Sequence, residues 1–147
     1  MHRYLVVANE TLLGMPLADE VRRRVADDAD CAIHLIVPAS HGAGMWTEGQ
    51  ARAKAARQLE HGEARMRQLG VHDVTGEVGD PNPVLAVGDA LLATDESYDE
   101  VLVSTLPLGR SRWLKQDVVH RLRRTYPKLQ VVHVVGSPAV AGAEASR

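Results

Sequence analysis

Short apolar segments alternate with longer amphipathic stretches along most of this chain. A short apolar run bounded by turn residues is typical of a strand buried on both faces of a sheet. Five segments are predicted to be strands, of which the third is the least apolar: residues 4–8, 31–37, 71–78, 101–103 and 129–135. Strand–helix alternation repeated four times, followed by a last strand, indicates a parallel sheet with helices on both faces.

The stretches between these segments carry helix start and stop signals. Pro16 suits the first turn of a helix, where its missing N–H does no harm. Thr47 and Gln50 have the spacing of a capping box, which predicts a second helix running to about Leu69. Gly62 is a weak point near the middle of that helix, because glycine is a poor helix former.

The last two helices have similar signals. Asp80 is predicted to cap the third helix, with Pro81 at its first position. Ser111 opens the fourth helix and Pro127 ends it. The residues predicted to face the core are Leu17, Val21 and Val25; Ala51, Ala55, Leu59, Met66 and Leu69; Val84, Leu85, Val87, Leu91 and Leu92; and Leu114, Val118, Leu122 and Tyr126. In the first helix, residues 22–24 are arginines and are expected to face water.

Length and composition fit one soluble globular domain. The 147 residues are predicted to form one domain at 1–136, followed by a small, polar, flexible tail at 137–147. A net charge of −2 argues against a dedicated nucleic-acid-binding domain. The N-terminus lacks the features of a signal peptide, and no apolar run approaches membrane length, so a cytoplasmic location is expected. Cys31 is the only cysteine, which excludes an internal disulfide and a cysteine-based metal site.

The charge is unevenly distributed, and the basic part follows the fourth strand. Residues 110–128 contain seven Lys or Arg residues and one Asp. A basic helix of this kind is either a solvated face or an electrostatic attractor for phosphate. Arg110, Arg112 and Lys115 crowd the loop and the first helical turn after Thr105. A strand end and a helix N-terminus meet there, which makes this loop the candidate anion site.

Four segments carry a resemblance to a known family: YLVVANET at the start, GDPNPVLAV at the third helix, DEVLVSTLPLGRSRWL at the fourth strand, and YPKLQVVHVV at the end. On these segments the chain resembles the universal stress proteins across residues 3–135. The resemblance implies a five-stranded, Rossmann-like parallel sheet in the order 3-2-1-4-5 and a part in the stress response. It also implies a homodimer through the last strand and, in one branch, ATP or AMP bound at the ends of the first and fourth strands.

The loop after the fourth strand departs from that nucleotide-binding branch. Members that bind ATP carry Gly-x-x-Gly, nine residues, and then Gly-Ser or Gly-Thr, whereas this loop contains only Gly109. Asn9 stands where the family has an Asp beside the nucleotide. Because glycines let backbone N–H groups approach phosphate oxygens, an identical triphosphate site is not expected. A rebuilt site remains open, and its candidate residues are Ala8, Asn9, Val37, Thr105, Gly109, Arg110, Ser111 and Arg112.

Each candidate residue also has a purely structural interpretation. Asn9 is either a turn residue at a strand end or a hydrogen-bonding partner of ribose or base. Ser111 caps a helix in either interpretation. Trp113 is expected to anchor the core rather than stack on a ligand, and His41 is a candidate substrate contact.

Metal and catalytic chemistry find little support in the sequence. The histidines, among them His34 and His133 in strands and His61 and His120 in helices, have no acidic partner at ligand spacing, so no metal site is predicted. There is no Gly-x-Ser-x-Gly elbow and no Walker loop, so the protein is predicted not to be an enzyme and to have no catalytic residues.

The last strand is predicted to be an exposed edge of the sheet. It begins at Leu129, ends at Val135 and contains no proline, so it is prone to pair with another strand. A two-fold antiparallel pair would cover it and would place Val132 or His133 near the axis, unless His133 points into its own subunit. Two hypotheses result. The chain is a small-molecule-binding module with an adenine nucleotide as ligand, or it is a dimeric structural or interaction protein with a degenerate nucleotide site.

Overall fold

The computed structural model describes residues 1–9, 11–39, 47–105 and 115–136. Strands and helices alternate along the described part of the chain, as the sequence predicts. In chain order they are β1 Arg3–Val7, α1 Met15–Asp27, β2 Ala32–Pro38, α2 Glu48–Gln68, β3 Asp73–Gly79, α3 Pro83–Leu92, β4 Glu100–Thr105, α4 Lys115–Thr125 and β5 Val131–Val135.

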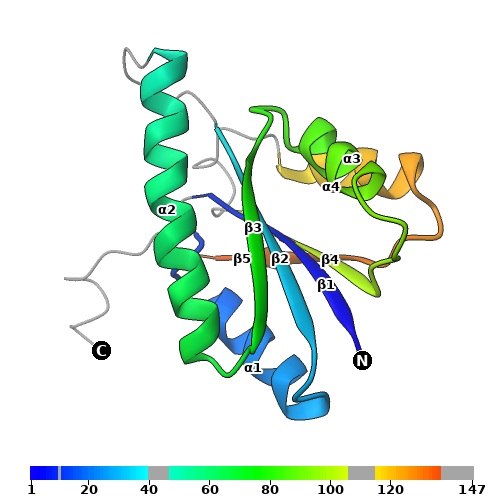
Figure 1. Cartoon of the computed structure of the whole chain (residues 1–147). Helices are drawn as coiled ribbons and strands as arrows, with labels where there is room; N and C mark the ends of the chain where they lie inside the picture. Colours follow the sequence, from blue (N-terminus) through cyan, green and yellow to red (C-terminus); the bar gives the residue numbers. More distant parts are fainter. Residues whose placement is uncertain (10, 40–46, 106–114, 137–147) are drawn as a thin grey trace.

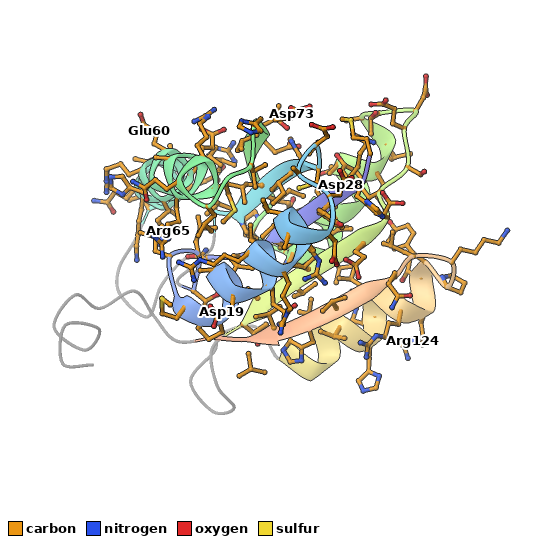
Figure 2. The ribbon with its side chains drawn as sticks, turned by 90° about the horizontal axis from the view of Figure 1, so that it is seen from below. Asp19, Asp28, Glu60, Arg65, Asp73 and Arg124 are labelled. Carbon is orange, nitrogen blue, oxygen red and sulfur yellow. The ribbon has the colours of Figure 1, made fainter. Side chains whose placement is uncertain are left out.

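The five strands form one parallel sheet in the order β3-β2-β1-β4-β5, so the expected fold and strand order are confirmed. Helices α1 and α2 lie on one face of this sheet, and α3 and α4 lie on the other (Figure 1). Figure 2 shows the same layers from below, with Asp19 on α1 and Arg124 on α4. Parallel strands need crossover connections, and the helices that make these crossovers cover both faces of the sheet.

Side chains alternate between the two helical layers along each inner strand. In β1, Tyr4 and Val6 pack against the α1–α2 layer, whereas Leu5 and Val7 pack against the α3–α4 layer. All four are at most 4% exposed. The unbroken apolar run of β1 therefore reflects a strand that is buried on both faces.

The start of α2 is confirmed. The Thr47 side chain accepts a hydrogen bond from the Gln50 N–H at 3.1 Å, and the Gln50 side chain accepts one from the Thr47 N–H at 2.9 Å. Gly62 has a packing role on the same helix. A Cβ at this position would lie 2.5 Å from Leu12 Cδ2, so glycine allows the β1–α1 connection to approach α2.

The predicted start of the third helix is wrong. Helix α3 begins at Pro83, and Asn82 caps it by accepting a hydrogen bond from the Val84 N–H at 2.9 Å. Asp80 instead accepts from the Asn82 N–H at 2.8 Å and so forms a turn before the helix. The sequence Asp-Pro-Asn-Pro offers two cap–proline pairs in succession, and the second pair is the one used.

Two residues of the predicted apolar stripe of α3 face solvent. Leu85 is 54% exposed and Leu92 is 88% exposed, whereas Ala86 and Ala90 are buried. The small side chain of Ala86 lies against the sheet. A Cβ placed on Gly79 would be only 2.9 Å from the Cβ of Ala86. Close helix–sheet contact therefore selects alanine for the inner face.

Arg24 does not face water, contrary to the prediction for residues 22–24. Its side chain is only 13% exposed, and its Nε donates to Glu100 Oε1 on β4 at 2.7 Å. Its terminal nitrogen donates to Glu20 Oε1 at 2.8 Å. Strand bounds also shift by one or two residues, most visibly at β3 and β5, which begin later than predicted.

Leu122 on α4 provides a test of the core. Its side chain is fully buried in the α3–α4 layer, so Leu122→Ala is expected to lower the free energy of unfolding by about 2–5 kcal/mol. Leu92→Ala is the matched control, because Leu92 is 88% exposed and its truncation should cost less than about 0.5 kcal/mol. Denaturant unfolding measures both changes. Equal losses in the two variants would mean that Leu122 does not face the core.

Candidate functional site

The candidate site lies at the carboxyl ends of β1 and β4, which are neighbours in the sheet. Val7 is in register with Val103, so the two strands end side by side. From β1 the chain builds the sheet outward through β2 to β3, and it then returns to add β4 and β5 on the other side. Ligands of open α/β sheets bind at such a reversal of strand order.

Three of the predicted site residues line the ends of β1 and β2. Ala8 and Val37 are fully buried, and the Ala8 N–H donates to the Ile36 carbonyl at 3.2 Å. The Asn9 side-chain amide donates to the Pro38 carbonyl at 2.8 Å. Asn9 therefore ties the end of β1 to the end of β2. An asparagine side chain has two N–H donors and an acceptor oxygen, so this bond uses only part of its capacity.

A buried hydroxyl pair joins the β1–α1 connection to β4. Thr11 Oγ1 and Ser104 Oγ are 2.6 Å apart, and both residues are only 1% exposed. Gly136 lies against this pair, because a Cβ there would be 3.2 Å from Thr11 Cβ. Sequence reasoning did not single out Thr11 or Ser104. The sequence feature that could have identified them is a polar residue just after or at the end of an apolar strand.

Thr105, a predicted site residue, contacts the neighbouring strand. Its hydroxyl Oγ1 is 2.7 Å from His133 Nε2, and its carbonyl accepts from the Gly136 N–H at 2.7 Å. Thr105 is 2% exposed. The His133 ring is thus directed at a residue of its own chain, as the alternative interpretation of that histidine expected.

The rest of the predicted anion loop lies outside the described residues. This applies to Gly109, Arg110, Ser111 and Arg112, and also to Trp113 and His41. In the part of the chain that the structure describes, the carboxyl edge brings together Asn9, Thr11, Ser104, Thr105 and His133. This arrangement is rich in groups that can form hydrogen bonds.

His34 has an acidic partner that its spacing in the sequence does not reveal. His34 Nε2 lies 2.7 Å from Glu77 Oε2, and its Nδ1 lies 2.7 Å from Thr75 Oγ1 on the adjacent strand β3. The partner comes from strand register, which pairs His34 with Thr75, and not from local spacing. Among the residues described, no three His, Cys, Asp or Glu side chains are grouped so that they could hold a metal ion.

Two further findings bear on the chemistry of the chain. Cys31 is buried, and burial raises the pKa of its thiol above the ordinary value, which favours the protonated form. No helix within the described ranges is both long and apolar enough to span a bilayer.

Comparison with known proteins gives matches at the level of structure. No family model matches the sequence, and no curated protein matches it. A universal stress protein solved in complex with cAMP superposes with a TM-score of 0.56 at 14% identity, over 92% of this chain and 98% of its own. A universal stress protein from Archaeoglobus fulgidus gives a TM-score of 0.57 at 13% identity, over 91% of this chain and 93% of its own. The chain therefore has the fold of the universal stress proteins.

Proposed function

We propose that this protein is a binding module for an adenine nucleotide, ATP or AMP, and that it has no catalysis of its own. The observation that carries the proposal is the reversal of strand order between β1 and β4, with Asn9 and Thr105 at the two strand ends. The cAMP held by a protein of the same fold supports the choice of an adenine nucleotide.

The proposed site divides recognition between two kinds of group. Asn9 and the backbone near Ala8 and Val37 contact the base and ribose, because these positions lie at the carboxyl ends of β1 and of its neighbour β2. Thr105, Gly109, Arg110, Ser111 and Arg112 contact the phosphates. Arginine forms paired hydrogen bonds with phosphate, which compensates for the glycines that this loop lacks.

The double variant Arg110→Ala/Arg112→Ala tests the phosphate contacts. Removal of two charge-assisted hydrogen-bonding groups is expected to weaken AMP binding at least about tenfold in isothermal titration calorimetry, with the melting temperature unchanged. Arg22→Ala/Arg23→Ala removes the same charge from exposed positions on α1 and should leave the affinity unchanged. Equal affinities in the two double variants would place the phosphates elsewhere.

A second candidate function is a structural or interaction protein with a degenerate site. The observation that favours it is that polar groups at the carboxyl edge already bond one another, Thr11 with Ser104 and Thr105 with His133. A group that is satisfied inside the protein has less to offer a ligand.

Ser104→Ala tests this structural role. It leaves the buried Thr11 hydroxyl without its partner, which is expected to cost about 1–3 kcal/mol in denaturant unfolding. Thr11→Val/Ser104→Ala removes both hydroxyls and should recover part of that loss, because no polar group is then left unpaired. Additive losses would show that the two hydroxyls are not coupled.

We further propose that β5 pairs with β5 of a second copy in a homodimer. The Gln130 carbonyl accepts from the Val101 N–H, and the Gly136 N–H donates to the Thr105 carbonyl. The backbone groups of the even-numbered residues of this strand therefore face β4. The Val131 carbonyl faces the other way and accepts from Arg123 at 3.0 Å. Val135, at 51% exposure, gives this outer edge an apolar end.

Val135→Lys tests the dimer. A charge at the apolar end of β5 is expected to weaken association at least about tenfold, because burial of an ammonium group is costly. Leu92→Lys makes the same change at an exposed leucine on α3 and should leave the dimer intact. Light scattering at several protein concentrations measures both variants. A monomer mass for the unmodified chain at every concentration would refute the proposal.

A further inference from the structure

A hollow of about 610 Å³ lies near the amino ends of β4 and β5, whereas the candidate nucleotide site lies at the carboxyl ends of the strands. It is formed by the connections that follow α3 and α4 and lead into β4 and β5. Both connections lie where the two helices end, on the α3–α4 side of the sheet (Figure 1). Its volume is within the usual range of small-molecule sites.

The floor of the hollow is apolar and aromatic. Leu91, Tyr98, Tyr126 and Leu129 are half-buried and pack on the core of the α3–α4 layer. Tyr126 reaches across to α3, where a Cβ at Gly88 would lie 2.9 Å from its hydroxyl oxygen. Each of these side chains packs against the core on one side and exposes its remaining surface to the hollow.

The rim next to α3 favours positive charge. Asp95 and Glu96 lie there, and Asp95 has no ion-pair partner among the described residues. The last turn of α3 contains no basic residue, so the negative end of its dipole is not offset from within the helix. Among the described residues that line the hollow, Lys128 on the opposite wall is the only cation.

The same connection already holds a cation on its other side. The Arg3 guanidinium lies 4.5 Å from the centre of the Tyr98 ring and donates to the Ser97 carbonyl at 3.1 Å. It also lies 3.6 Å from the Glu96 carboxylate. An aromatic face, a carbonyl and a carboxylate thus combine to bind a positively charged group.

We propose that this hollow binds a small organic cation with an apolar body, an ammonium group carried on an aromatic or alkyl frame. The ammonium group lies between Asp95 and the carboxyl end of α3, and the body lies on Tyr126, Leu91 and Leu129. Glu96 is paired with Arg3, so the Asp95 carboxylate and the carboxyl end of α3 are what disfavour an anion at this rim, whereas Lys128 lies on the opposite wall.

The probe is 2-phenylethylammonium, titrated into the ¹⁵N-labelled full-length protein and followed by its amide spectrum. Saturable shifts are expected at residues 94–98 and 125–129. Phenylacetate has the same ring with the opposite charge and is expected to bind at least about tenfold more weakly. Shifts that do not saturate, or equal binding of the two probes, would overturn the proposal.

Charge variants with matched controls complete the test. Asp95→Asn is expected to weaken binding of 2-phenylethylammonium at least about fivefold, and Lys128→Ala to strengthen it about twofold. Asp19→Asn removes the same charge from α1, on the other face of the sheet (Figure 2), and should change nothing. Equal effects of the two aspartate variants would refute a local site. AMP binds the opposite edge in the proposed function, so the two proposals fail independently.

Discussion

The central position of β1 is the constraint on which the rest of this structure depends. The strand has a hydrogen-bonded neighbour on each side and a helical layer on each face. Its backbone groups are therefore paired within the sheet, and its side chains must be apolar in both directions. The chain can extend such a sheet only by working outward on one side and then returning to the other. The reversal that results places the ends of β1 and β4 side by side, with Asn9 following β1 and Thr105 ending β4.

Much of the fold could be predicted from the sequence, because its signals are local. The capping box of Thr47 and Gln50 is contained in four residues, and the four-residue spacing of Val118 and Leu122 is contained in one helix. Where two local signals compete, the sequence does not decide between them. Asp80 and Asn82 each precede a proline, and the structure uses the second pair.

The interactions that sequence reasoning missed join residues far apart in the chain. Thr11 and Ser104 are 93 positions apart, and Arg24 and Glu100 are 76 apart. Its spacing of seven residues from Leu17 places Arg24 on the buried face of α1, unlike its two arginine neighbours, but this spacing does not reveal Glu100 as its partner. Part of the candidate site could still be anticipated, because Asn9 and Thr105 end predicted strands. The partners of these residues follow from strand order and register, which periodicity does not report.

The contact between Gly62 and Leu12 has an evolutionary consequence. Helix α2 packs closely over the β1–α1 connection only because position 62 has no side chain and position 12 has a large one. A larger side chain at position 62 therefore requires a smaller one at position 12. Relatives that carry alanine or serine at position 62 are therefore expected to carry a smaller residue at position 12, so the two positions should covary. Helix α2 would otherwise be displaced outward, and the chain segment that contains Asn9 and Thr11 would lose its support.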